Sequence, residues 1–275
     1  MFDRDSPIGV LDSGIGGFSV ARQVQRLLPG EDLLYFGDGA NVPYGNHSSD
    51  EIVAMSRYMF QFMEERGVKA LLVACNTISC VADLCDDVVS CPVFNAVQAG
   101  ADAAVETAHR LGIHKIGVIS TVFTHSTNCY PEHIAALAPE LTVCSHGCPD
   151  LAQLVERHLC DPDGMSHVDA NLREELDGLV GREEIHACVL GCTHYSLVEE
   201  NIRKLYPRLP LIDPAEQMAL KLRECLAERD LLQQRSSGGR LDVYTTSDVE
   251  EYENRAKQAG LDPVSSVSLY PAMSL

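Results

Sequence analysis

Basic residues and long apolar runs are both scarce in this sequence, and each scarcity excludes a class of protein. The 275 residues include 21 Lys or Arg against 40 Asp or Glu, so the formal charge is -19 and the isoelectric point is near 4.8. A field of this sign repels phosphate backbones and anionic lipids, and we expect no nucleic-acid partner. No apolar run approaches the ~20 residues of a membrane span, and segment 1–7 lacks the basic and apolar regions of a signal peptide. We therefore expect a cytoplasmic protein that does not bind membranes.

Cysteine is too sparse for a disulfide scaffold. Eleven cysteines in 275 residues is a low density, and an odd number cannot all pair within one chain. We expect free thiols in a reducing compartment. Because 45% of the residues are apolar, the chain can bury the core of one large or two mid-sized domains. The question is then which thiols carry out chemistry.

Short runs rich in Val, Ile and Leu alternate with segments of helical period, a pattern typical of β-α-β units and a mostly parallel sheet. We predict strands over residues 8–11, 33–36, 70–74, 91–95, 115–119, 141–144, 187–190 and 241–245. We predict helices over residues 17–28, 49–66, 98–111, 151–159, 168–180 and 248–259, and one more that follows 211–213 and ends near 229. The predicted fold class is α/β.

The sequence also contains an internal repeat. Residues 8–13 align with 116–121, because both are apolar strands that run into hydroxyl or carboxyl side chains. Residues 70–79 align with 187–196, and in both the apolar strand is followed by a cysteine and two polar residues. The repeat predicts two similar domains.

The two repeated cysteines, Cys75 and Cys192, suggest a particular reaction. In an open α/β sheet, ligands bind beyond the carboxyl ends of the strands, where both cysteines lie. If two similar domains face each other, the two thiols approach one ligand from opposite sides. One thiol can then remove a proton from a carbon while the other delivers a proton to the opposite face, which inverts a stereocentre. A helix N-terminus beside each thiol would favour the thiolate and bind carboxylate.

Short motifs spread over most of the chain together resemble one known family. They are Asp12-Ser13-Gly14-Ile15-Gly16-Gly17, Tyr35-Phe36-Gly37-Asp38, Val42-Pro43-Tyr44-Gly45, Ala74-Cys75-Asn76-Thr77, Thr121 with Thr124, Gly191-Cys192-Thr193-His194-Tyr195 and Leu211-Ile212-Asp213. In order and spacing they resemble the glutamate racemases of the aspartate/glutamate racemase superfamily, which make D-glutamate for peptidoglycan. The resemblance implies a cofactor-independent isomerase that interconverts L-glutamate and D-glutamate.

The resemblance also implies roles for particular residues. Cys75 and Cys192 would be the acid/base pair. Asp12 and His194 would assist them, with Glu156 as a further acidic assistant. The residues implied to bind the substrate are Asp12, Ser13, Tyr44, Gly45, Asn76, Thr77, Thr121, Thr193 and His194. The implied partner is a small amino acid, no metal or cofactor is implied, and a homodimer is expected.

The same resemblance implies how the chain divides. The first α/β domain would comprise residues 1–97 and 213–275, and the second residues 98–212. Their mostly parallel sheets would be related by pseudo-twofold symmetry, with the active site in the cleft between them. The sequence departs from the family at Gly39, Asn41, Gln98 and Ser120, where Thr, Arg, Glu and Gly are usual. Because Asn41 removes a cation near the binding loop, aspartate or a related acidic substrate is an alternative to glutamate.

Two other classes of function are open to this sequence. The segment Gly14-Ile15-Gly16-Gly17-Phe18-Ser19 is similar to a dinucleotide fingerprint of an NAD-dependent oxidoreductase, but Asp38 comes late for the residue that binds the ribose. A binding module that had lost catalysis should have lost a thiol, and both thiols are present.

A zinc site and inert packing are the alternatives for the other cysteines. The segment Cys144-Ser145-His146-Gly147-Cys148 could supply zinc ligands, and the set could be completed by His186, Cys188, Cys192 and His194. There is no CxxC pair, however, and alternation along a strand separates neighbouring side chains, so we expect no metal. We expect packing roles for Cys80, Cys85, Cys91, Cys129, Cys160, Cys188 and Cys225.

Overall fold

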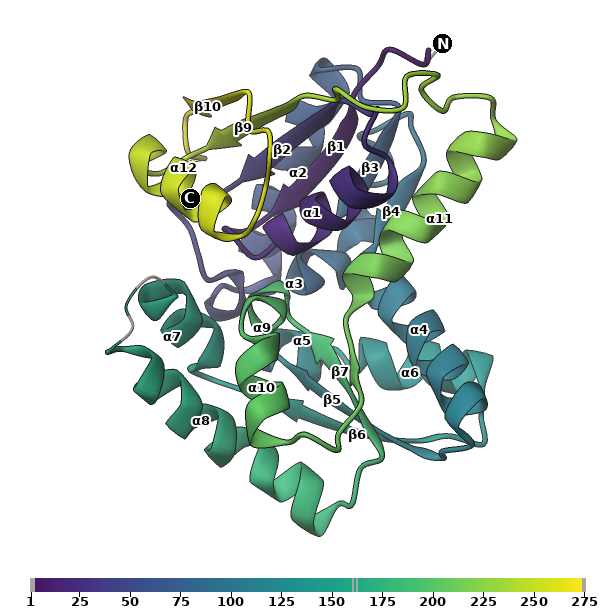
Figure 1. Ribbon diagram of the computed structural model, residues 1–275, viewed down its shortest axis with the longest axis vertical. Coiled ribbons are helices and arrows are strands. Elements are labelled where there is room, and N and C mark those ends of the chain that lie inside the picture. Colours follow the sequence, from purple (N-terminus) through teal and green to yellow (C-terminus); the bar gives the residue numbers. More distant parts are fainter. Residues whose placement is uncertain (1–2, 160, 162, 274–275) are drawn as a thin grey trace.

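The strands of the protein form two separate sheets, one above the other in Figure 1. The computed structural model describes residues 3–159, 161 and 163–273, so Cys160 lies outside the described residues. All strand pairs that it describes are parallel. The predicted α/β class with two mostly parallel sheets is confirmed.

The first sheet has six strands in the order β10-β9-β2-β1-β3-β4. They are β1 (Ile8–Asp12), β2 (Leu33–Gly37), β3 (Ala70–Val73), β4 (Val93–Asn95), β9 (Leu241–Thr245) and β10 (Ser266–Leu269). The associated helices are α1 (Phe18–Leu27), α2 (Ser49–Glu65), α3 (Asn76–Ser79), α11 (Pro214–Glu228) and α12 (Val249–Gln258), with the short turns η1 (Tyr44–Asn46) and η2 (Ala82–Cys85). Val10 packs with α1 and α11 on one face, and Leu11 packs with α2 on the other. Burial on both faces explains why β1 reads as a continuous apolar run.

The second sheet has four strands in the order β6-β5-β7-β8. They are β5 (Lys115–Ser120), β6 (Thr142–Gly147), β7 (Ala187–Gly191) and β8 (Leu211–Ile212). Its helices are α4 (Ala96–Leu111), α5 (Val122–Ser126), α6 (Cys129–Leu137), α7 (Leu151–His158), α8 (Met165–Asp177), α9 (Thr193–Leu197) and α10 (Glu199–Leu205), with a π-helical turn η3 (Gly178–Arg182). Side chains of α4 and α6 cover one face, and side chains of α7 and α8 cover the other.

The two sheets share one topology. The strand order β2-β1-β3-β4 in the first sheet matches β6-β5-β7-β8 in the second. In each, the strand that comes first in the chain lies between the second and the third strands, and the fourth strand lies beyond the third. Strands β1 and β5 begin the segments that align in sequence, and β3 and β7 carry the other aligned pair. The internal repeat therefore corresponds to equivalent strands.

Helices α4 and α11 carry the chain between the sheets and lie together at one side of the molecule (Figure 1). Asn95 caps the start of helix α4 with a side chain that accepts a 2.8 Å bond from the Gln98 N–H, and Gly112 caps its end with a left-handed φ of 65°. Helix α11 begins at Asp213, whose side chain accepts a 3.0 Å bond from the Ala215 N–H. The exact division at residues 97 and 212 stays a prediction.

Several elements differ from the sequence prediction. Strand β6 runs on to Gly147, and the helices over 122–126 and 129–137 were not predicted. Strand β10 was not predicted either, because this half-exposed edge strand mixes serine with its apolar residues. No helix in the described part of the chain is both long and apolar enough to cross a bilayer.

Candidate active site

The carboxyl ends of the central strands meet at the boundary between the two sheets. Asp12 ends β1, and Cys75 follows β3 as the residue before α3. In the second sheet Thr121 follows β5, and Cys192 follows β7 as the residue before α9. The repeat thus brings equivalent strand ends of both sheets to one place.

Hydrogen bonds between side chains cross this boundary. Thr193 Oγ1 donates to Asp12 Oδ2 at 3.0 Å, and the hydroxyls of Thr77 and Thr121 lie 3.1 Å apart. Tyr130 donates its hydroxyl proton to Asn76 Oδ1 at 2.6 Å. The two parts of the chain therefore meet through polar groups, and all of these except Tyr130 are substrate-binding residues implied by the sequence.

Two glycines allow the close approach. A Cβ on Gly16 would lie 2.2 Å from Thr193 Oγ1, and a Cβ on Gly45 would lie 2.9 Å from the Thr121 Cβ. Neither position tolerates a side chain without movement of the facing segment. Gly45 thus acts through contact with the second sheet.

The thiol of Cys75 has acidic and hydroxyl neighbours. Its side chain is 5% exposed, and Sγ donates to Ser13 Oγ at 3.6 Å. Burial, with the nearby Asp12 carboxylate, raises the pKa of the Cys75 thiol to about 12. Cys192 is close enough to contribute to this shift. At neutral pH Cys75 is therefore protonated.

The thiol of Cys192 faces a histidine instead. Its side chain is also 5% exposed, and its Sγ lies 3.8 Å from His194 Nδ1. His194 Nε2 lies 2.5 Å from Glu156 Oε2, and Arg255 Nη1 donates to Glu156 Oε1 at 3.3 Å and to its backbone oxygen at 2.6 Å. A chain of thiol, imidazole, carboxylate and guanidinium thus runs outward from Cys192.

The charges of this chain of groups support one another. Burial disfavours the imidazolium of His194, but the hydrogen bonds to Cys192 and Glu156 outweigh it and hold the pKa of His194 well above its usual range. Burial also disfavours the Glu156 carboxylate, but His194 and Arg255 lower the pKa of Glu156 overall. We infer an imidazolium at His194 and a carboxylate at Glu156.

Asp12 lies between the two thiol environments. It is fully buried; its Oδ1 accepts from the Gly14 N–H at 2.9 Å and its Oδ2 accepts from Thr193. Burial raises the pKa of Asp12, and the charge on His194 offsets part of that rise. A buried carboxylate in this place can accept a further donor such as an ammonium group.

Tyr44 contributes to the site indirectly. Its hydroxyl donates to Asp38 Oδ2 at 2.6 Å, and Asp38 also accepts from Asn41 at 3.0 Å and from Thr246 at 2.6 Å. Both Asp38 oxygens are therefore engaged within the protein. This carboxylate holds the loop in shape, and an NAD ribose would have to compete with three donors.

The departures from the family pattern have local explanations at some positions. Asn41 bonds Asp38 as described, and a Cβ on Gly39 would lie 2.5 Å from Ser247 Oγ. Gln98 is exposed in the first turn of α4. Ser120 is fully buried at the end of β5, and its hydroxyl donates to the Thr121 carbonyl at 3.2 Å.

The sequence did not identify every residue at this boundary. Arg255 on α12 and Tyr130 on α6 gave no motif signal, and each is linked to the site only by folding. Cys80 and Cys129, expected to be inert, bring their sulfur atoms within 3.1 Å of each other across the same boundary. Next to Glu156, a cavity of about 290 Å³ opens between Gly39, Val42 and α12.

Comparison with known proteins places the chain in a family. The Asp/Glu/Hydantoin racemase family matches residues 8–221. A glutamate racemase from Levilactobacillus brevis is 34% identical over 259 residues, which cover 93% of this chain and 91% of that protein. Because the match extends over most of both sequences, this chain belongs to the Asp/Glu/Hydantoin racemase family.

Solved structures agree with the sequence match. A glutamate racemase isoform from Bacillus anthracis superposes with a TM-score of 0.88 and 35% identity, covering 98% of this chain and all of that one. A glutamate racemase from Francisella tularensis, in complex with D-glutamate, has a TM-score of 0.87 and 29% identity, covering 99% of this chain and 100% of that one. The chain is thus similar in sequence and in structure to enzymes named glutamate racemases.

Proposed function

We propose that this protein is a glutamate racemase, which interconverts L-glutamate and D-glutamate without a cofactor and uses Cys75 and Cys192 as its two proton-transfer groups. One observation carries the proposal: two buried thiols follow equivalent strands of two facing sheets, in a chain whose relatives are named glutamate racemases. Its product, D-glutamate, would be used in peptidoglycan synthesis.

The two thiols would act on opposite faces of the α-carbon. Cys192, beside the His194 imidazolium, would enter as thiolate and take the α-proton, while the Cys75 thiol gives its proton to the other face. After one turnover Cys192 is a thiol and Cys75 a thiolate, so the protein is then ready for the reverse direction. The proton count balances without an added acid or base.

The groups around the thiols would hold the charge as the proton moves. Asp12 is placed to accept the substrate ammonium, and its charge also keeps the proton on Cys75. The Glu156 carboxylate would hold His194 in its charged form and in one orientation. Asp12 would therefore favour the protonated thiol at Cys75, whereas Glu156, through His194, would favour the thiolate at Cys192.

Local donors would bind the dicarboxylate. A protein of charge -19 gives no long-range attraction to an anion. The hydroxyls of Ser13, Thr77, Thr121 and Thr193 and the backbone N–H groups after Cys75 and Cys192 would supply the contacts. Location in the cytoplasm and a homodimer stay predictions from the sequence.

A cofactor-free assay in D₂O tests the proposal. Reduced protein is mixed in turn with L-glutamate, D-glutamate, L-aspartate and D-aspartate, and polarimetry and proton NMR follow the optical rotation and the α-proton. We expect loss of rotation and exchange with both glutamate enantiomers and much slower change with aspartate. Faster turnover of aspartate would replace the proposed substrate, and no change with any of the four would contradict racemase activity. Dependence on added NAD would favour the oxidoreductase.

A further inference from the structure

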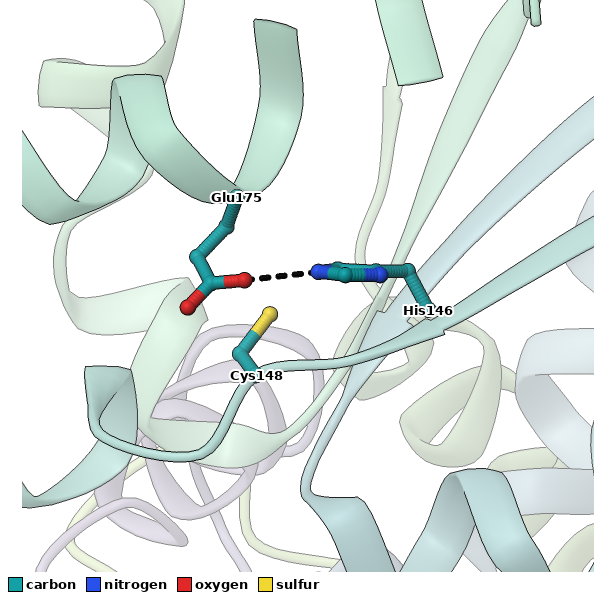
Figure 2. A group of neighbouring side chains, drawn as sticks. All are labelled: His146, Cys148 and Glu175. Atoms are coloured by element: carbon teal, nitrogen blue, oxygen red, sulfur yellow. Dashed lines mark hydrogen bonds and ion pairs between the residues drawn. The ribbon is translucent and has the colours of Figure 1, made fainter. Parts of the chain in front are cut away.

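A second group of reactive side chains lies in the second sheet, apart from the two thiols of the proposed function. His146 is on the edge strand β6, Cys148 follows that strand, and Glu175 is on α8. Their candidate donor atoms all lie within 4.8 Å of one another. Figure 2 shows the three side chains converging from the strand and the helix on one point.

Strand register accounts for this convergence. Cys144, His146 and Cys148 are two residues apart, so along an extended chain they share one side. That side faces α8, whose Val168, Leu172 and Leu176 are buried in the same core as Cys148. The alternation that was expected to separate donors of this segment instead aligns them.

The carboxylate in this group is buried on the side of α8 that faces the core. Glu175 is 8% exposed and Cys148 is 2% exposed, whereas the His146 side chain is 40% exposed. His146 Nε2 lies 2.6 Å from Glu175 Oε2. Burial of a carboxylate is costly unless a cation or donors compensate it, and here an imidazole and a thiol surround it.

An ion can reach the group from solvent. A cavity of about 420 Å³ is lined by His146 and Glu175, and also by Cys144 and Ser145. It offers room for a water molecule as a fourth ligand, and Cys144 is a further sulfur donor on its wall. His146 and Glu175 thus have an entrance from solvent and an open coordination position, and Cys148, which is 2% exposed, belongs to the buried core beside them.

We propose that His146, Cys148 and Glu175 bind a divalent transition metal ion of the zinc type. Sulfur, imidazole nitrogen and one carboxylate oxygen are ligands of Zn²⁺ and Co²⁺, whereas Mg²⁺ and Ca²⁺ prefer oxygen alone. Zinc-ligand bonds of about 2.0–2.3 Å put tetrahedral donor atoms roughly 3.3–3.8 Å apart. On binding, His146 Nε2 and Glu175 Oε2, which are 2.6 Å apart, therefore separate by roughly 0.7 Å, and any pair near the 4.8 Å limit closes by about 1 Å. The Cys148 thiol loses its proton to solvent as the metal–sulfur bond forms.

The site adjoins the helix that follows Cys192. Cys148 is buried in the same core as Tyr195 on α9, and the Cys148 N–H donates to the Ser120 carbonyl at 2.8 Å. The Tyr195 hydroxyl donates to the same carbonyl at 3.3 Å. The metal ligands therefore belong to the packing around the proposed active site without being part of it.

Titration with Co²⁺ as the probe tests the site on the full-length reduced protein. Cobalt bound to a thiolate gives a charge-transfer absorption band, and we expect one such band per chain in the unchanged protein. Cys148→Ser should abolish the band, and His146→Ala and Glu175→Gln should each weaken Co²⁺ binding by at least about tenfold. Zn²⁺ added afterwards should displace the cobalt and remove the band.

Matched variants separate this site from other thiols and histidines. Cys225→Ser and His109→Ala change groups outside the cluster, and Cys192→Ala removes the proposed catalytic thiol; all three should keep the band. Circular dichroism checks that each variant is folded. If Cys148→Ser does not fold, Glu175→Gln takes its place as the test variant. No band in the unchanged protein, or a full band in folded Cys148→Ser, would overturn the proposal. Loss of the band in Cys192→Ala alone would assign the metal to the catalytic thiol and overturn it too. Since the band is read without substrate, its absence would leave the proposed racemase function intact.

Discussion

Cys75 and Cys192 occupy equivalent places in two sheets of one topology, yet their surroundings carry opposite charge. Cys75 lies beside the Asp12 carboxylate, and its pKa is raised to about 12 by burial and that charge. Cys192 lies 3.8 Å from His194, whose imidazolium is held by Glu156. The repeat thus supplies two thiols in matching positions, and the residues that differ between the halves place a carboxylate beside one thiol and an imidazolium beside the other.

Removing either thiol should have the largest effect on the racemase rate. Cys75→Ala and Cys192→Ala should each lower kcat for both glutamate enantiomers by about 10²–10⁴-fold, because each removes one proton-transfer group. Initial rates measured by circular dichroism of the substrate check this. Cys225→Ala, a half-buried cysteine on α11, should keep its full rate. A Cys192→Ala protein with normal kcat would exclude the two-thiol assignment.

Forcing the halves apart should have the next largest effect. In Gly16→Ala the new Cβ would lie 2.2 Å from Thr193 Oγ1 and 2.7 Å from its Cβ. We expect the free energy of unfolding to fall by about 1–3 kcal/mol and the racemase rate to fall by up to about 100-fold. Urea unfolding and initial rates measure both. Gly181→Ala is the matched control, since a Cβ there meets no atom within 4 Å; equal losses in both variants would refute the contact argument.

Changing the charge behind His194 should alter pH dependence more than rate. Glu156 raises the pKa of His194, so Glu156→Gln lowers it, and the imidazolium is lost at a lower pH. We therefore expect the alkaline limb of kcat/KM to move to lower pH, with a fall of about tenfold at neutral pH. Glu251→Gln, which alters the other partner of Arg255, should leave the limb in place. An unchanged limb in Glu156→Gln would separate His194 from the proton transfer.

Removing one hydrogen bond at the boundary should have the smallest effect. Tyr130→Phe deletes the 2.6 Å bond to Asn76 Oδ1 and should cost about 1 kcal/mol of unfolding free energy. Because Asn76 begins α3 directly after Cys75, KM should rise a few-fold while kcat changes less. Tyr206→Phe, which deletes an exposed 2.7 Å bond to Asp177, should change neither constant. Equal KM values in the two variants would contradict a role for this bond in substrate binding.

The sequence predicted the parts of the fold that depend on burial. Strands such as β1 and β7 are covered on both faces and read as apolar runs, and the cysteine after β7 repeats the one after β3. Edge strand β10 is half exposed, so it carries no comparable pattern. Only its parallel pairing with β9 identifies β10 as a strand.

The sequence predicted the candidate site less fully, for a related reason. Residues that belong to motifs, such as Asp12 and His194, could be predicted from the sequence alone. Arg255 contacts Glu156 from a helix far along the chain, and Glu175 approaches His146 from α8, so neither pairing has a local signal. The loss of a cation at Asn41 was visible in sequence, but its bond to Asp38 was not.

The position of solvent deuterium at low conversion tests the two-thiol account most directly. L-glutamate is incubated with the protein in D₂O, and the reaction is stopped well before equilibrium. The two enantiomers are then separated, and the deuterium content of each is measured by mass spectrometry. Because Cys192 and Cys75 would face opposite sides of the α-carbon, the account predicts deuterium in the D-glutamate formed and almost none in the remaining L-glutamate. Deuterium at equal levels in both enantiomers would mean that one group serves both faces, and would contradict it.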